Sequence, residues 1–186
     1  MSKPSRPSNP SDATGSPRTF FVTTRTAGGR SLFQTDRMTA LLIDILRSTM
    51  RSGEATIHDF AITPNHVHIL LTIPEEVSLE KAVQLIKGRF SFRANKELSF
   101  HGEIWQRGFS NVRVTDEASF QHHRQYIANN PVKAGLASSP EEYPYGSACL
   151  KKRKRAGAEA QHSAPLDGTI RRGGSCPVTE PLEIEL

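Results

Sequence analysis

The eight residues Pro64-Asn65-His66-Val67-His68-Ile69-Leu70-Leu71 constrain the fold more than any other part of the chain. The apolar run after the turn-forming Pro-Asn pair is typical of a β-strand, in which side chains alternate with a period of two. His66 and His68 should therefore share one face, with Val67 on the other. Two adjacent imidazoles can form half of a site for a divalent metal ion. The alternative is a chance histidine pair in an exposed strand.

The residues around this strand predict a mixed α and β domain. Residues 57–62 also have a strand pattern, and the short connection favours an antiparallel hairpin. A first strand is predicted at residues 20–24, and a helical apolar stripe runs from Asp36 to about Met50. A second helix should begin after Ser78, and the last extended segment should lie within residues 105–115. The order β-α-β-β-α-β-α predicts an α+β fold, an antiparallel sheet with helices largely on one face.

A further helix should begin at Thr115 or Asp116 and carry a second group of polar side chains. Tyr126 and Asn130 are four residues apart and therefore share a helix face. The helix is expected to end near Asn130, because Pro131 disfavours the α conformation in the residue before it. A tyrosine and an amide would then project together from a helix end. Judged alone, this pattern also fits an amphipathic helix with a partly exposed tyrosine.

Four blocks together resemble the single-tyrosine HUH nucleases, in which two histidines flank a hydrophobic residue, and most closely their REP-associated tyrosine transposase branch. The blocks occur in that family's order and at about its spacing, and the resemblance covers roughly residues 18–146. It implies a ferredoxin-like HUH domain. The matching blocks are residues 64–68, 86–90, 105–109 and 126–136.

The resemblance also implies a reaction and the residues for it. Tyr126 would attack a DNA strand and become linked to the 5′ phosphate, leaving a free 3′ hydroxyl. His66 and His68 would bind a divalent metal ion, Mg²⁺ or Mn²⁺, with Asn130 as the third protein ligand. The expected function is a metal-dependent single-strand DNA endonuclease and strand transferase, a transposase-like enzyme acting on hairpin or REP-type DNA.

Basic residues supply candidates for contact with single-stranded or hairpin DNA. Such contacts would mostly position phosphates and carry no sequence information themselves. The helix flank that supplies three of them could equally be a solvated face. The candidates are Arg89, Arg93, Lys96, Arg107, Arg113 and Lys133.

An alternative function is a DNA- or RNA-binding regulator of the same fold that has lost catalysis. A metal hydrolase that uses water is a weaker alternative, because it gives the tyrosine no role. A monomer is expected, with a dimer as the alternative.

The ends of the chain differ in composition from its centre. Residues 1–17 are rich in Pro and Ser and predict a disordered arm, followed by the nuclease domain at 18–146. Residues 147–186 contain the basic run 151–155 and predict a disordered or loosely docked tail. Both termini of the chain are therefore expected to be flexible. The net charge of +5 permits a nucleic-acid partner. Two late cysteines give no disulfide framework, and no apolar run approaches membrane-spanning length. A cytoplasmic, nucleoid-associated protein without a membrane partner is therefore expected.

Overall fold

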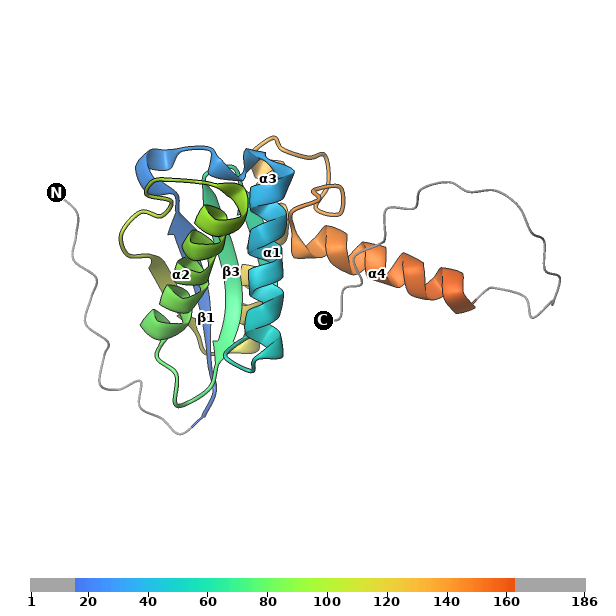
Figure 1. The fold of residues 1–186 in the computed structure, drawn as a ribbon. Helices are drawn as coiled ribbons and strands as arrows, with labels where there is room; N and C mark the ends of the chain where they lie inside the picture. The colour runs from blue at the N-terminus through green and yellow to red at the C-terminus, as the bar shows by residue number, and fades with distance from the viewer. Residues whose placement is uncertain (1–15, 163–186) are drawn as a thin grey trace, which may run out of the picture.

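The computed structural model describes residues 16–162, with side chains up to residue 157, and is built on a four-stranded antiparallel sheet. The strand order in the sheet is β2-β3-β1-β4 (Figure 1). This confirms the α+β class and the antiparallel hairpin. The strands are β1 (Arg18–Arg25), β2 (Thr56–Thr63), β3 (His66–Ile73) and β4 (Ser110–Val114).

The described part of the chain also forms four helices, and two short 3-10 turns, η2 (Ala27–Gly29) and η3 (Leu32–Gln34), follow β1. In Figure 1, α1 and α2 lie in front of the sheet and α4 extends away from the body. Within residues 16–162, no helix is long and apolar enough to span a membrane. The helices are α1 (Asp36–Arg51), α2 (Leu79–Leu98), α3 (Glu117–Lys133) and α4 (Ser147–His162).

The two faces of the sheet carry separate cores, which corrects the expectation that the helices lie largely on one face. Val67, Ile69 and Leu71 of β3 belong to the larger core, with the buried sides of α1 and α2. Leu70 points the other way and packs with Ile127 of α3 in the smaller core. The central strand β3 is therefore buried on both faces, which explains its nearly continuous apolar sequence.

The strand register places both histidines on the α3 face of the sheet. Leu70 lies opposite Phe21 of β1, and His68 lies opposite Thr23. Because side chains alternate along β3, His66 and His68 share the face of Leu70, on which α3 packs. The sheet thus presents the histidine pair to the helix that contains Tyr126.

Helix α3 continues one turn beyond the end predicted for it. Pro131 lies inside the helix and is buried, so the prediction that the helix ends near Asn130 was wrong. The chain leaves the helix at Gly135, which has a φ of 68°, a left-handed conformation that glycine adopts without strain. The Leu136 N–H donates to the Pro131 carbonyl, 2.9 Å away, as in a Schellman motif. Gly135, rather than Pro131, marks the helix end in this sequence.

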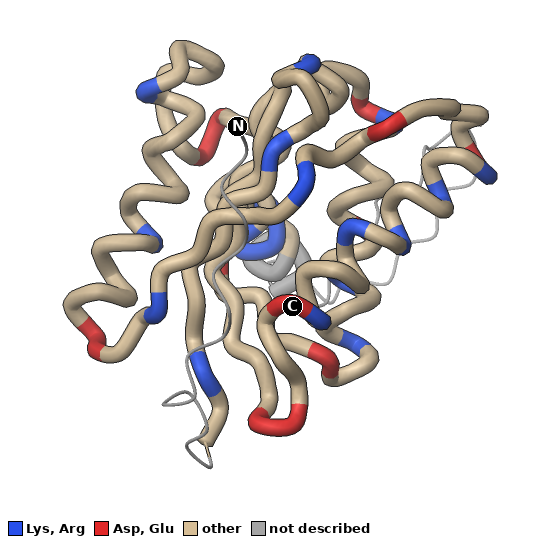
Figure 2. Tube along the Cα trace, turned by 90° about the vertical axis from the view of Figure 1, so that its left-hand side faces the viewer, with Lys and Arg blue, Asp and Glu red and all other residues tan. Residues whose placement is uncertain are grey.

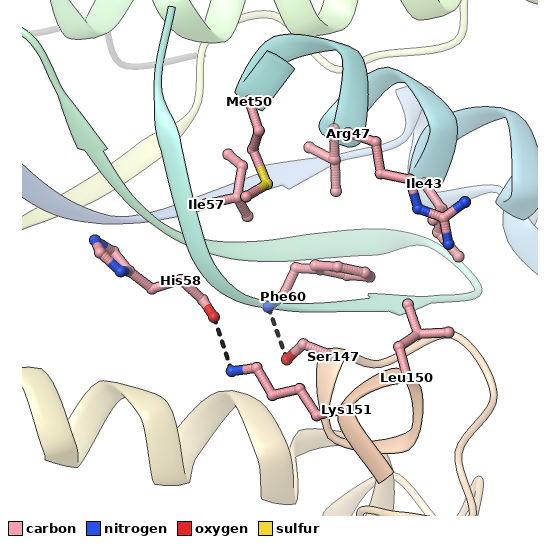
Figure 3. Close-up of a pocket in the computed structure, with 10 residues that line it drawn as sticks. Ile43, Arg47, Met50, Ile57, His58, Phe60, Ser147, Leu150 and Lys151 are labelled. Atoms are coloured by element: carbon pink, nitrogen blue, oxygen red, sulfur yellow. Dashed lines mark hydrogen bonds between the residues drawn. The ribbon is translucent and has the colours of Figure 1, made fainter. Parts of the chain in front are cut away.

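Residues 147–162 form a helix, where the sequence predicted a disordered or loosely docked tail. Helix α4 begins at Ser147, and its first turn packs against β2 and α1 (Figure 3). Ser147 Oγ accepts from the Phe60 N–H at 3.2 Å, and Lys151 Nζ donates to the His58 carbonyl at 3.0 Å. The parts of the expected flexible ends at residues 1–15 and 163–186 lie outside the described residues, and the domain limits remain predictions.

One buried carboxylate connects α4, β2 and α3. Asp59 of β2 accepts hydrogen bonds from Ser147 Oγ at 2.8 Å and from Lys151 Nζ at 2.7 Å. Its other oxygen accepts from Nε of Arg124 on α3, at 2.8 Å. Three elements that are distant in the sequence therefore meet at one side chain.

Removing this carboxylate should destabilise the fold. Asp59→Ala leaves Arg124 and Lys151 without their partner, and a lost hydrogen bond to a buried charged group costs about 2 kcal/mol. Urea unfolding should show this loss, and hydrogen exchange should accelerate in the first turn of α4. The matched control is Glu97→Ala, which breaks an exposed pair with Arg93 and should lower the free energy of unfolding much less. Equal losses in the two variants would contradict the role given to Asp59.

Candidate active site

The histidine pair of β3 forms the floor of the candidate site. The rings of His66 and His68 lie 4.8 Å apart between centroids, nearly perpendicular to one another. His66 Nδ1 lies 2.7 Å from Oδ1 of Asn65, and His68 Nδ1 lies 2.8 Å from Oγ1 of Thr23. Each imidazole is thus held through Nδ1, and this arrangement leaves Nε2 for another partner.

These hydrogen bonds favour the tautomer that can bind a metal ion. An amide oxygen can only accept, so His66 Nδ1 donates to Asn65 and leaves Nε2 with a lone pair. Thr23 can accept from His68 in the same way. A hydrogen bond to one ring nitrogen commonly orients a histidine whose other nitrogen is a metal ligand.

Two buried polar atoms at the site have no partner in the described part of the chain. They are Nε2 of His68 and Oδ1 of Asn130. A buried acceptor left without a hydrogen bond costs about 1–3 kcal/mol, so such atoms usually have a ligand or a function. Two imidazole nitrogens and one amide oxygen are ligands that suit Mn²⁺ or Mg²⁺. The residues present therefore fit a divalent metal ion.

Burial keeps both imidazoles neutral. It lowers the pKa of His68 to about 3, with the nearby charges of His66 and Arg25 adding to the effect. Burial also lowers the pKa of His66, and Arg25 acts in the same direction while the Asn130 side chain opposes it. Only neutral imidazole can bind a metal ion, so both histidines are in the required form at neutral pH.

Tyr126 stands beside this pair on α3. Its ring meets the His68 ring edge-on at 5.4 Å, and the side chain is 37% exposed. Lys133, one of the predicted DNA contacts, places Nζ 5.6 Å from the centre of the tyrosine ring. The structure thus brings together four predicted site residues and one predicted DNA contact.

Phe21 of β1 is the ring on which this group packs. It stacks on His68 at 5.4 Å, meets Tyr126 edge-on at 5.6 Å and lies 4.8 Å from His123. It also packs against the smaller core beneath α3. Phe21 therefore sets how the tyrosine helix sits relative to the histidine strand.

The other predicted DNA contacts lie away from the site. Arg89 forms a two-point ion pair with Glu54 at 2.5 and 2.6 Å. Arg93 bonds to Asp44 of α1 and to Glu97, and Lys96 lies over the exposed ring of Phe92, also on α2. These arginines thus hold neighbouring elements of the protein together on the face opposite Tyr126.

Two further candidates lie near β4. Arg113 stacks over the ring of Phe20, on the side of the larger core, and Arg107 is exposed in the loop before the strand. Figure 2 shows Lys and Arg positions on both sides of the sheet. Whether these residues contact DNA remains a prediction.

Two of the four sequence blocks, residues 86–90 and 105–109, hold the end of β1 in place. Trp105 Nε1 donates to the Lys87 carbonyl at 3.1 Å, and Lys87 Nζ donates to the carbonyls of Gln106 and Gly108, both at 2.9 Å. The Gln106 N–H in turn donates to the Arg25 carbonyl at 2.9 Å. This loop therefore holds the end of β1 next to His66.

Sequence reasoning missed Phe21, Thr23, Arg25 and Asn65. Three of them alternate along β1 on the side that faces α3, so the strand period could have grouped them. Their position beside the histidines depends on the pairing of β1 with β3. No local pattern gives that register, because the two strands are far apart in the chain.

Comparison with known proteins identifies the family and the fold. A family model described as "Transposase IS200 like" matches residues 21–130, which include His66, His68, Tyr126 and Asn130. A solved structure of a REP-associated tyrosine transposase bound to a REP hairpin has the same fold, with a TM-score of 0.63 and 22% identity. That match covers 96% of this chain and 100% of the other.

Two curated proteins are also similar. A Haemophilus influenzae protein provisionally named a REP-associated tyrosine transposase is 30% identical over 96 residues, covering 46% of this chain and 54% of that protein. The REP-associated tyrosine transposase of Escherichia coli K12 is 25% identical over 130 residues, covering 69% and 75%. The chain thus spans about half the length of the first relative and three quarters of the second. The family match extends over more than half of the chain, and the chain belongs to the IS200-like transposase family.

Proposed function

We propose that this chain is a metal-dependent single-strand DNA endonuclease and strand transferase that acts on hairpin DNA of the REP type. The observation that carries the proposal is the contact between the Tyr126 and His68 rings, beside two buried acceptors that have no partner among residues 16–157. Family membership supports DNA as the substrate, and the hairpin-bound relative supports the hairpin. Tyr126 is the proposed nucleophile.

His66, His68 and Asn130 would hold the metal ion, through the two imidazole Nε2 atoms and the amide oxygen. When bound, the ion would polarise the phosphate that is cleaved and lower the demand on the nucleophile. Imidazole ligands suit Mn²⁺ better than Mg²⁺, so either ion should support activity, with Mn²⁺ the better of the two.

The tyrosine would carry out covalent catalysis. A phenol has a pKa of about 10 and is mostly protonated at neutral pH. Tyr126 Oη would attack the phosphorus, and its proton would pass to solvent. An Oη–P bond forms while the bond from phosphorus to the 3′ oxygen breaks, and that oxygen takes up a proton to become a 3′ hydroxyl. The phosphotyrosine bond keeps the energy of the broken linkage, so a 3′ hydroxyl can reverse the step and join strands.

Two cations near the site would receive the charged strand. Lys133 lies over the tyrosine ring, and Arg25 acts electrostatically on both histidines. Their charges would oppose the negative charge of the phosphate in the transition state. Phe21 would keep the tyrosine and histidine rings in contact during the reaction.

The nucleophile is tested by Tyr126→Phe, which removes only the hydroxyl from a partly exposed ring. Incubation with 5′- and 3′-labelled single-stranded hairpin DNA and Mn²⁺ should give a covalent protein–DNA band on a denaturing gel. The variant should lose this band and all cleavage while binding DNA with unchanged affinity. Tyr143→Phe, which alters a buried tyrosine bonded to the Ile62 carbonyl, is the control and should still form the adduct.

An adduct formed by Tyr126→Phe would assign the nucleophile elsewhere. A wild-type protein that binds the hairpin without cleaving it in Mn²⁺ would instead support the non-catalytic regulator.

The metal site is tested by binding as well as by activity. His68→Ala and His66→Ala should each weaken Mn²⁺ binding at least tenfold, measured by titration with electron paramagnetic resonance of the free ion, because a ligand is lost. Asn130→Ala should weaken binding less, and EDTA should abolish cleavage by the wild type. His101→Ala alters an exposed histidine that bonds only to Asn95 among the described residues and should change nothing. Full cleavage in EDTA would exclude the metal-dependent mechanism.

The supporting role of Phe21 predicts a separate kinetic effect. Phe21→Leu keeps an apolar side chain but removes the ring that contacts Tyr126 and His68. The rate of adduct formation at saturating DNA should fall about tenfold or more, because the nucleophile is held less precisely. DNA affinity should not change. Phe92→Leu, at a ring that is 67% exposed on α2, is the matched control and should react at the wild-type rate.

A further inference from the structure

A basic groove lies on the other flank of the tyrosine helix. It has a volume of about 620 Å³ and runs between α3 and α4 along the β2 edge of the sheet. One wall is formed by Gln121, Arg124 and Gln125 of α3. The opposite wall is formed by Lys151, Lys152 and Arg155 of α4.

The groove keeps a positive charge after its internal ion pairs are counted. Four cationic and two acidic side chains line it, and the acids are Asp59 and Glu141. Asp59 is buried and already accepts hydrogen bonds from Arg124 and Lys151. Among the described residues, it accepts from Arg124 only through Nε, and the guanidinium also lies 5.9 Å from the centre of the Phe120 ring. The α4 wall adds Lys152 and Arg155, which are exposed.

The groove and the candidate active site share α3. Arg124 and Tyr126 are two residues apart and therefore project from different sides of the helix. The helix with its side chains is about 10 Å across. A strand that leaves the tyrosine and crosses the exposed face of α3 would thus reach the groove within a few nucleotides. Gln125, which directly precedes Tyr126 in α3, also lines the groove.

We propose that this groove binds the sugar–phosphate backbone of DNA that flanks the phosphate attacked by Tyr126. Arginine and lysine side chains on two facing walls would bind successive phosphates, and the glutamine amides would supply neutral hydrogen bonds. The inference rests on the proposed function for its substrate. It also divides the basic run 151–155, because Lys151, Lys152 and Arg155 line the groove whereas Arg153 and Lys154 do not.

Two double variants of the full-length chain separate the groove from general charge. Lys152→Gln with Arg155→Gln removes two cations from the groove wall. Arg153→Gln with Lys154→Gln removes two exposed cations of the same helix that do not line the groove. Both variants lower the net charge equally, and their thermal melting should match the wild type. The probe is a labelled DNA hairpin with a single-stranded flank, titrated in EDTA at several salt concentrations so that no cleavage occurs.

The groove variant should bind about tenfold more weakly near physiological salt. The slope of log affinity against log salt should be shallower by about 1.4, the value for two lost single-strand phosphate contacts. The control variant should keep the wild-type affinity and slope. Removing the single-stranded flank from the hairpin should weaken binding by the wild type and leave the groove variant nearly unchanged.

Equal losses in the two variants would overturn the proposal, because they would show diffuse attraction by the whole helix. Unchanged binding by the groove variant would overturn it as well. The chemistry is judged separately by the covalent adduct. If the wild type forms the adduct but the groove variant binds DNA as the wild type does, only this inference is refuted. If the groove variant shows the shallower salt dependence but the wild type forms no adduct, only the catalytic proposal is refuted.

Discussion

The packing of Ile127 against Leu70 determines where the reactive groups lie. Ile127 is the fully buried anchor of α3, and Leu70 occupies the same strand face as the two histidines. With α3 held at that point, Tyr126 comes to lie beside His68, and Asn130 lies one helical turn further along. A strand with apolar side chains on both faces is required for this arrangement, because β3 must support the larger core on its other side. The site therefore depends on a structural feature that carries no chemistry itself.

Much of this arrangement could be predicted from the sequence, because it depends on local periodicity. The histidine strand, the hairpin, the helices α1 to α3 and the shared face of Tyr126 and Asn130 all follow from periods of two or about 3.6 residues. The strand register does not, so Thr23, Phe21 and Arg25 were missed. The end of α3 was misjudged because Pro131 is accommodated inside the helix, and the glycine that ends the helix lies four residues later.

Charges proved harder to interpret from sequence than apolar patterns. Arg89 and Arg93 are candidates for phosphate contacts, and they pair with Glu54 and Asp44, which are 35 and 49 residues away in the chain, while Arg93 also pairs with the nearby Glu97. Conversely, the basic run after residue 150 looked like a solvated tail, although Lys151 is held by Asp59. A cation's partner is decided by the tertiary fold, so local composition cannot separate an internal ion pair from a binding surface.

The two cores differ in size, and this difference determines which part of the fold should unfold locally. The larger core joins α1 and α2 to the sheet through many buried side chains, whereas α3 rests on a cluster built around Ala61, Leu70, Val114 and Ile127. Regions with few buried apolar contacts open at a lower free energy than the whole domain unfolds. Helix α3 should thus behave as a separate cooperative unit, detaching and reclosing while the rest stays folded. The nucleophile is therefore carried by a helix that can open without unfolding the larger core.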